Sequence, residues 1–347
     1  MAAAWLMLLL VTGWSMSLRD VAAAAAGYAF VPTIVYYVVL VTALTEAVQW
    51  PLAFYQGVIL ERRYGLSAQP VAGWWVDRLK TGGVAVVLAV AGALIIWSFL
   101  RWSPTYWWLA ASGCFVAVLV LLVQVGPALL LSAFSTLKPV RRPALGLRIV
   151  RLADRAGAGA LGVFEWQLRH HTRRANAVLA GVGRTRRILL SDTLLTEHSD
   201  DEIEVVLAHE LGHHVHHDIW KAIALDAILI VVGFYLADMA LGAAVGRFGL
   251  SSVDDIAGLP LLVLTAGTVS LALVPLANAL SRAHERRADR YALKMTGNPK
   301  AFMSAMRRLA AQNLAEERPS RLVEILFCSH PSVAARLDAA RAWTAGR

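Results

Sequence analysis

The sequence predicts a mainly α-helical, polytopic membrane protein with a smaller α+β domain outside the bilayer. The chain has 347 residues, of which 58% are hydrophobic and only 16% are charged. Because a soluble domain has a charged fraction of about a quarter, the composition favours a membrane protein. Long apolar runs alternate with two hydrophilic stretches, residues 135–220 and 282–347, and these stretches can form the domain outside the bilayer.

Several apolar runs are long enough to cross a bilayer as a helix, which takes about 20 residues. They comprise residues 28–50, 84–102, 106–134, 221–245 and 259–280. A shorter run, residues 4–18, is interpreted as a retained first span, because no basic residue precedes it and no clear cleavage site follows. A signal peptide is the alternative for this run. The sequence therefore predicts about six spans, with five as the alternative.

The distribution of basic residues predicts the orientation. They cluster in residues 61–80, in residues 138–187 and after residue 281, whereas the connectors 102–105 and 247–258 carry few. By the positive-inside rule the basic segments face the cytoplasm. This topology explains much of the net charge of +9, and with no nucleic-acid-binding module present we expect no nucleic-acid partner. The Ala- and Arg-rich composition indicates the inner membrane of a bacterium.

The hydrophilic stretches carry local signals for both helices and strands. Residues 145–156 have a helical pattern, and residues 161–168 and 176–190 read as strands, the latter divided into a hairpin at Gly181. Ser199 and Glu202 form a capping-box pattern at the start of a helix. The two cysteines, Cys114 and Cys328, give neither a disulfide framework nor a cysteine metal site.

The helix predicted from Ser199 leads into the pattern His-Glu-x-x-His at residues 209–213. Residues four apart lie on one face of a helix, so His209 and His213 can bind one metal ion. Glu210 then lies beside the ion, where it can take a proton from the attacking water and pass it to the leaving amine. The pattern predicts one Zn²⁺ per chain, since two imidazoles with a carboxylate favour zinc.

A catalytic zinc site needs a third protein ligand and an open position, and the candidates lie after the last apolar run. Glu285 and Asp289 are again four residues apart, on a helix expected to open at Ser281. Glu285 can complete a His-His-Glu site, and Asp289 can accept a hydrogen bond from the free ring N–H of a ligand histidine. A transmembrane hairpin between His213 and Glu285 would bring the two helices together.

These motifs resemble those of the integral-membrane zinc metallopeptidases that include the type I CAAX prenyl protease and the bacterial heat-shock membrane protease. The resemblance implies a cytoplasmic gluzincin-like α+β metallopeptidase domain with a small sheet, acting on protein or peptide substrates. The segment from Trp50 to Tyr55 and that from Glu61 to Ser67 resemble the prenyl-protease branch and favour it, although that branch has seven spans and six are counted here. Cleavage of CAAX-type substrates and quality control of membrane proteins both remain open.

The resemblance also implies further site residues. Asn176 and Ala177 open a strand that corresponds to the family's substrate-binding edge strand. His330, followed by Pro331, and Arg336 correspond to a C-terminal element that stabilises the oxyanion formed from the scissile carbonyl. The predicted parts are a membrane region at 1–135 with about four spans, a catalytic part at 136–220, a transmembrane hairpin at 221–281 and catalytic helices at 282–347.

Two other interpretations of the motif are open. A site-2 intramembrane protease also uses His-Glu-x-x-His, but it places the motif within a span, whereas Asp200, Asp201 and Glu202 precede the motif here. The other alternative is a membrane scaffold or transporter whose histidines bind a metal without catalysis. Charged residues within the spans would favour transport, and Asp226 and Asp238 are among the few.

Overall fold

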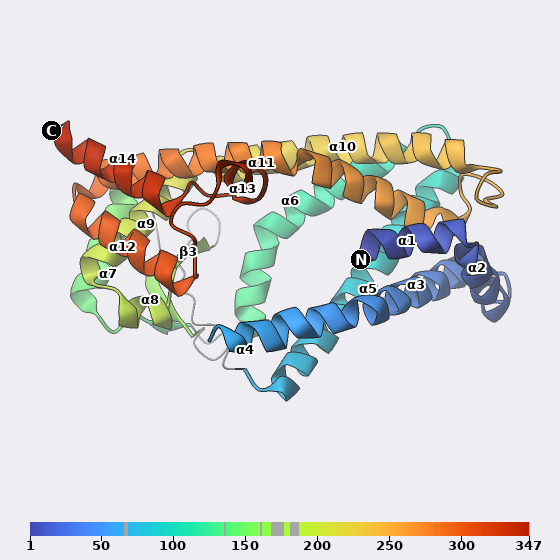
Figure 1. Ribbon diagram of the computed structural model, residues 1–347, viewed down its shortest axis with the longest axis horizontal. Helices are drawn as coiled ribbons and strands as arrows, with labels where there is room; N and C mark the ends of the chain where they lie inside the picture. The colour runs from blue at the N-terminus through green and yellow to red at the C-terminus, as the bar shows by residue number, and fades with distance from the viewer. Residues whose placement is uncertain (66–68, 135–136, 160–161, 168–176, 181–186, 347) are drawn as a thin grey trace. The chain divides into compact units, whose positions relative to one another are not determined.

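The computed structural model describes residues 1–65, 69–134, 137–159, 162–167, 177–180 and 187–346. The chain divides into two compact units, each assembled from two segments (Figure 1). Unit 1 comprises Met1–Val118 and Leu225–Ala272, and unit 2 comprises Leu119–Ala224 and Leu273–Arg347. The four parts predicted from the sequence are consecutive ranges, whereas each compact unit combines two separate segments. The four-part division stays a prediction.

The membrane helices confirm the predicted fold class. Among the described residues, five helices are long and apolar enough to cross a bilayer, or six if a bent pair at the N-terminus counts as one span. The five comprise α3 (Phe30–Phe54), α5 (Val71–Trp102), α6 (Trp107–Phe134), α10 (Asp218–Ala244) and α11 (Leu259–Thr296). A π-helical turn, Tyr55–Leu60, and the short α4, Glu61–Arg63, extend α3.

The bent pair corresponds to the short first span expected from the sequence. Helices α1 (Ala2–Val11) and α2 (Trp14–Ala25) meet at 77°. The bend lies at Gly13, whose φ of 79° suits glycine because it has no Cβ. The pair packs within unit 1, where the hydroxyl of buried Ser15 bonds both Tyr37 and the carbonyl of Ala257. Arg19 of α2 forms an ion pair with Asp255.

Unit 2 contains a small mixed sheet of four strands in the order β1-β2-β4-β3. The strands are β1 (Lys138–Pro139), β2 (Val163–Trp166), β3 (Ala177–Ala180) and β4 (Arg187–Ser191). Strands β3 and β4 are antiparallel, with Ala177 opposite Leu190, as the hairpin interpretation requires. The predicted turn at Gly181 lies outside the described residues. Strand β3 is the outer strand on its side of the sheet.

Helices enclose the core of unit 2. They are α7 (Pro143–Arg155), α8 (Asp192–Glu197), α9 (Asp200–Val215), α12 (Pro299–Gln312) and α14 (Val333–Ala345). The short α13 (Arg321–Phe327) has no buried residue and lies outside this core. Helix α9 packs against α7, α12 and β3, and α12 also packs against α14. Their apolar faces meet at fully buried residues such as Ile149, Leu207 and Phe302. Helix α9 is therefore held from several sides.

Helix α11 differs from the sequence expectation of a separate helix that opens at Ser281. It continues without a break from Leu259 to Thr296 and so joins the last apolar run to Glu285 and Asp289. Alanine, arginine and glutamate after Leu280 are good helix formers, and no glycine or proline separates them from the span. The same helix therefore carries a membrane segment and the second motif.

Candidate metal centre

Helix α9 presents two histidines on one face. A capping box fixes its first turn: the Ser199 hydroxyl accepts from the Glu202 amide, and the Glu202 carboxylate accepts from the Ser199 amide at 2.8 Å. The helix then continues to Val215, so His209 and His213 lie one turn apart on the same side. The helix start predicted from the sequence is confirmed, and it sets the direction of both imidazoles.

Gly212 allows α11 to approach α9 beside these histidines. A Cβ at this position would lie 3.0 Å from the Cα of Ala288 and 3.3 Å from its Cβ. Packed interiors do not tolerate such contacts without movement, so a larger residue would separate the two helices. Ala288 lies between Glu285 and Asp289 in the sequence of α11. The close crossing therefore brings both carboxylates to the histidines.

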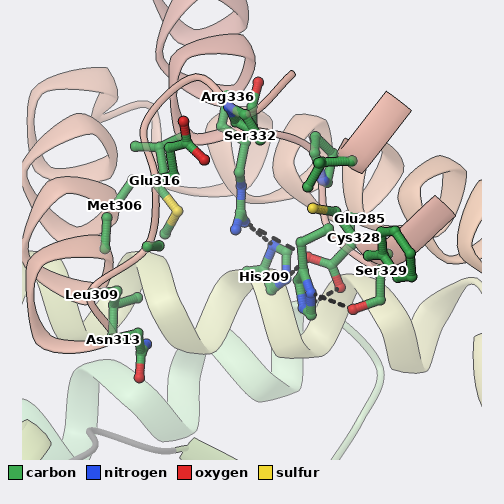
Figure 2. Close-up of a pocket in the computed structure, with 18 of the residues that line it drawn as sticks. His209, Glu285, Met306, Leu309, Asn313, Glu316, Cys328, Ser329, Ser332 and Arg336 are labelled. Atoms are coloured by element: carbon green, nitrogen blue, oxygen red, sulfur yellow. Dashed lines mark hydrogen bonds and ion pairs between the residues drawn. The ribbon is translucent and has the colours of Figure 1, made fainter. Parts of the chain in front are cut away.

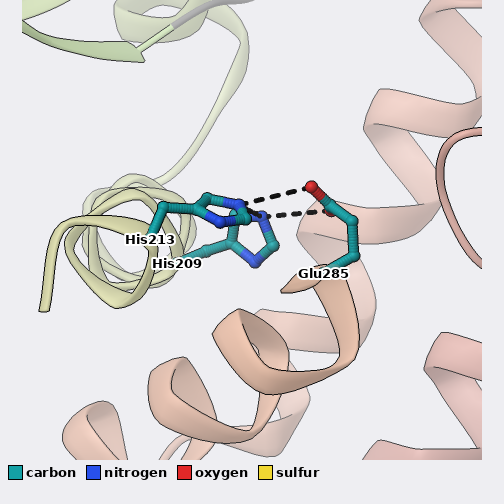
Figure 3. A group of neighbouring side chains, drawn as sticks. All are labelled: His209, His213 and Glu285. Carbon is teal, nitrogen blue, oxygen red and sulfur yellow. Dashed lines mark hydrogen bonds and ion pairs between the residues drawn. The ribbon is translucent and has the colours of Figure 1, made fainter. Parts of the chain in front are cut away.

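Three donor side chains converge at this crossing, as Figure 3 shows. The Nε2 atoms of His209 and His213 are 3.2 Å apart, and each lies 3.3 Å from a different carboxylate oxygen of Glu285. Their donor atoms all lie within 4.8 Å of one another. Within the described part of the chain, these are the one group of His, Cys, Asp and Glu side chains placed to hold a metal ion.

The donor set fits a tetrahedrally coordinated metal ion. Ligand bonds of about 2.0–2.1 Å place neighbouring donors about 3.3 Å apart around such an ion, and the three separations agree with this value. Among the described residues, the buried Oε2 atom of Glu285 has no hydrogen-bond partner, although Nε2 of His209 lies 3.3 Å away. Such an oxygen is costly unless something else occupies it. Three protein donors also leave a fourth position open for water.

Each ligand histidine has its own carboxylate on the far side of the ring. The Nδ1 atom of His209 lies 2.9 Å from Asp289, and that of His213 lies 3.1 Å from Asp218. An N–H at Nδ1 that donates to a carboxylate leaves the Nε2 lone pair directed at the metal position. Asp289 therefore lies where the sequence predicted it, beside a ligand histidine.

Sequence reasoning missed Asp218. It is the first residue of α10, follows His213 by five positions, and also contacts Arg287 and Lys221. Its side chain is 7% exposed, so these contacts compensate a buried negative charge. An aspartate directly after a His-Glu-x-x-His helix was the available signal.

The carboxylates set the charge of the metal-free site. Burial opposes protonation of His209, but its bonds to Asp289 and Glu285 raise the pKa of His209 to about 9. The Glu285 carboxylate lies 3.3 Å from each imidazole, where its negative charge favours their protonated form. Without a metal ion, the His209 imidazole therefore holds a proton near neutral pH, and a metal ion must displace that proton when it binds.

A cavity of about 610 Å³ opens beside this cluster. In Figure 2, Met306, Leu309 and Asn313 lie on one side of it and His209 and Glu285 on the other. The volume is in the range of ligand-binding pockets.

Glu210 also lines the cavity, and burial raises its pKa. A carboxylate with a raised pKa next to an open cavity is suited to taking up and releasing a proton. The structure thus places the predicted base where a substrate could reach it.

His330 and Arg336 line the same cavity from the C-terminal segment. The Nε2 atom of His330 lies 3.5 Å from Glu285, and its Nδ1 lies 2.9 Å from the Ser329 hydroxyl. Arg336 donates through Nε to Asp289 at 2.8 Å and through Nη2 to the other oxygen of the same carboxylate. His330 therefore faces the site directly, whereas Arg336 bonds Asp289 and also lies 3.5 Å from Nδ1 of His209 and 3.8 Å from Oε2 of Glu285.

The predicted substrate-binding strand is described only in part. Asn176 lies outside the described residues. Ala177 is the first residue of β3, and it is buried against the core of unit 2. Among the described strands, β3 is the outer one, and one of its edges has no described neighbour.

Apolar membrane helices joined to a His-His-Glu centre with a glutamate beside it define a class of protein, the polytopic membrane metallopeptidases. Comparison with known families agrees. Residues 139–344 match the model of peptidase family M48, and residues 1–136 match that of the CAAX prenyl protease N-terminal region, described as five membrane helices. The chain belongs to peptidase family M48.

Individual relatives cover most of the chain. An uncharacterized metalloprotease, YhfN of Bacillus subtilis, is 30% identical over 95% of this chain and 78% of its own length. CAAX prenyl protease 1 of Saccharomyces cerevisiae is 28% identical over 86% of this chain and 70% of its own length. The crystal structure of S. mikatae Ste24p has the same fold, with a TM-score of 0.87 over 96% of this chain and 83% of that one at 23% identity.

These findings confirm the activity predicted from the motifs. The chain is a metallopeptidase of a zinc-dependent family, and its membrane helices make it a membrane endopeptidase that acts on protein or peptide substrates.

Proposed function

We propose that one zinc ion per chain, held by His209, His213 and Glu285, supports hydrolysis of membrane-associated protein substrates at the cytoplasmic face of a bacterial inner membrane. The observation that carries the metal site is the convergence of these three donors at 3.2–3.3 Å. Its support is the fixed Nδ1 side of both imidazoles, since each histidine bonds a separate carboxylate. Two imidazoles and a carboxylate are a donor set typical of catalytic zinc.

The residues around the metal centre have different roles in peptide hydrolysis. When bound, zinc supplies Lewis acidity that polarises the scissile carbonyl and makes water acidic enough to react near neutral pH. Glu210 takes the proton from the attacking water and then donates it to the leaving amine. His330 donates from Nε2 to the oxyanion that develops on the carbonyl.

We propose that Arg336 acts through Asp289 and not on the substrate itself. The sequence interpretation gave Arg336 a direct role with His330 at the oxyanion. In the structure both nitrogens of Arg336 that bond a carboxylate bond Asp289. We therefore assign Arg336 to positioning: it holds Asp289, which in turn holds His209.

The edge of β3 is proposed to bind the substrate backbone. An extended peptide can add to an unpaired strand edge through main-chain hydrogen bonds. Ala177 begins this strand, and Asn176 directly precedes it. β3 packs against α9, the helix that carries the zinc motif, so a peptide along β3 would lie near the metal centre.

Two substrate classes fit the relatives. CAAX prenyl protease 1 of S. cerevisiae favours CAAX-type processing. A Bacteroides fragilis HtpX homolog, 30% identical over 46% of this chain, and the Bacillus relative favour a bacterial role. We favour processing or quality control of membrane proteins, because bacteria largely lack prenylated substrates.

Replacement of the base tests the catalytic assignment. We expect Glu210→Gln to retain one zinc per chain and to lose about 10²–10⁴-fold in activity, the usual contribution of a general base. Zinc content would be measured together with cleavage of unfolded membrane proteins and a farnesylated CAAX peptide. Glu204→Gln is the matched control, because Glu204 lies on the same helix but pairs with Arg148 at the surface.

The outcome separates the alternatives. The cleaved member of the panel identifies the substrate class. If Glu210→Gln cleaves as well as the parent protein, or if neither protein holds zinc, the catalytic assignment fails and a non-enzymatic scaffold or transporter becomes the better interpretation.

A further inference from the structure

Helix α13 (Arg321–Phe327) carries apolar side chains on two faces. Val323 and Phe327 are four residues apart and line the catalytic cavity. Leu322 and Ile325 are three residues apart and point the other way, because each residue of a helix is rotated by about 100° from the one before. Leu322 is 70% exposed and Ile325 is 42% exposed, and neither lines the cavity. These two side chains form what we call the outer face of α13.

Hydrogen bonds from α11 hold α13 in place, as the neighbouring ribbons in Figure 1 indicate. Asn278 donates to the carbonyl of Leu326 at 2.8 Å. Arg282, which is itself buried, donates to the carbonyls of Glu324 at 2.8 Å and Cys328 at 2.7 Å. These bonds satisfy carbonyl groups at the C-terminal end of the helix. Helix α13 is therefore fixed within one side-chain length of α11.

The two donors of α11 lie at the end of a membrane span. The apolar run ends at residue 280, so Asn278 lies in its last turn and Arg282 lies just beyond it. At a rise of about 1.5 Å per residue, both lie within about 3 Å of the end of the run along the helix axis. The polar headgroup layer adds about 5–8 Å to each side of the hydrocarbon core. When α11 spans a bilayer, α13 therefore lies at the level of the headgroups.

The charges of α13 suit a lipid surface. Arg321 is exposed and lies next to Ile325 on the helix, four residues before it. Its alkyl stem can lie along apolar surface while the guanidinium reaches the phosphate groups of lipids. The acidic residue of α13, Glu324, accepts from the amide of Ser332 at 3.4 Å. Apolar side chains flanked by a basic residue are typical of helices that lie in a membrane interface.

We propose that the outer face of α13 inserts into the headgroup–acyl boundary of the bilayer that α11 spans. The occupant is lipid because the face lies at the height of the headgroups. The two acidic and two basic residues from 316 to 321 balance, which leaves little charge to steer a protein partner. Since the opposite face of α13 lines the catalytic cavity, this contact connects one wall of the cavity to the membrane surface. The contact does not depend on hydrolysis.

Fluorescence quenching measures the contact directly. A dansyl amino acid replaces Leu322 in the full chain, which is reconstituted in nanodiscs whose lipid carries a nitroxide near either the glycerol end or the methyl end of the acyl chain. We expect the label to lose most of its fluorescence to the first lipid and less to the second, because an interfacial helix reaches only about 5–10 Å into the boundary. The matched control is the same label at position 147, since Leu147 of α7 is 60% exposed in the same unit.

The control label should be quenched by iodide in the water and not by the nitroxide lipids. If the label at position 322 behaves in the same way, its face borders water and the proposal is wrong. Protection of that label from both quenchers would also overturn the proposal, because a protein would then cover the face.

A pair of alanine substitutions addresses the contact without a label. Leu322→Ala combined with Ile325→Ala should release α13 from the lipid, so that its backbone amides exchange hydrogen roughly tenfold faster in nanodiscs. Alanine is the better helix former, so faster exchange would not come from helix propensity. We expect Leu147→Ala, the matched control, to leave the exchange of α13 unchanged. Exchange at the parent rate in the double variant would show that lipid does not hold α13.

Discussion

The two histidines that we propose as zinc ligands are supported in the same way but in different surroundings. His209 bonds Asp289, which is held by Arg336, and His213 bonds Asp218, which is held by Arg287. The His209 side chain is 10% exposed and that of Arg336 is 14% exposed, against 26% for His213 and 31% for Arg287. The two carboxylates are equally buried, with Asp289 6% and Asp218 7% exposed, so the two sets of contacts differ in burial at the histidine and at the arginine.

The difference in burial predicts that loss of the same type of residue has a different effect on the free energy of unfolding in the two sets of contacts. Among the contacts around His209, loss of one partner leaves a charge inside the protein with little water to replace it. Among those around His213, water and Lys221 can substitute for a missing partner. We therefore expect the contacts around His209 to contribute more to the free energy of unfolding, and both sets of contacts to affect the affinity for zinc.

Removal of each carboxylate is expected to give the largest contrast. Asp289→Ala leaves Arg336 without its bidentate partner and should lower the free energy of unfolding by about 3–5 kcal/mol. Asp218→Ala should cost about 1 kcal/mol, because Arg287 and Lys221 are partly exposed. Thermal unfolding of the zinc-free proteins measures both values, and equal losses would contradict the comparison.

Asparagine replacements keep the shape and remove the charge, so they address the metal. We expect both Asp289→Asn and Asp218→Asn to weaken zinc binding by about 10- to 100-fold, as loss of a carboxylate behind a ligand histidine generally does. The larger loss is expected for Asp289→Asn. Competition with a chromophoric chelator measures the affinity, with Asp200→Asn as a control in the exposed first turn of α9. An unchanged affinity in both variants would show that the carboxylates do not act through the histidines.

The pH dependence follows from the pKa of His209, which is about 9 in the zinc-free site. Below that pH zinc must displace a proton, so its apparent affinity should rise at least tenfold per pH unit up to about pH 9. The raised pKa also stabilises the zinc-free protein below the unfolded value of about 6.5, and this contribution is lost as the pH rises through about 9. In Asp289→Asn the rise in affinity should level off at a lower pH. A flat affinity profile from pH 6.5 to 9 would exclude this protonated state.

The smallest effect is expected for Lys221→Met. The Lys221 side chain is 47% exposed and bonds Asp218 at 3.2 Å, and such exposed pairs contribute about 0–1 kcal/mol. Unfolding temperature and zinc affinity should both stay close to those of the parent protein. A large loss in either would mean that Asp218 depends on this lysine, and the contacts around His213 would then be as sensitive as those around His209.

The parts of the fold that depend on local chemistry could be predicted from the sequence. Apolar runs located the membrane helices, and the Ser199 capping box located the start of α9. The continuity of α11 was missed because a change from apolar to charged residues suggested an end, although helix propensity does not change there.

The parts of the candidate site that depend on tertiary contacts could not be predicted. The four-residue spacing predicted that His209 and His213 share one helix face and that Glu285 and Asp289 share another, because each pair lies on one helix. Asp218 was missed because His217 adopts a φ of 54° between α9 and α10. This is unusual for a residue with a side chain, and it turns the chain so that Asp218 faces back to His213. The contact of Gly212 with Ala288 likewise depends on how two helices cross.

Because α11 is unbroken, it fixes the height of Glu285 above the end of the apolar run. Glu285 lies five residues beyond Leu280, where the sequence places the end of the apolar run, and five residues of α-helix rise about 7–8 Å. An extended chain covers that height in two or three residues. A substrate anchored in the same bilayer would then be cut close to the point where it emerges, and bonds far along a long extramembrane tail would reach the metal only by looping back.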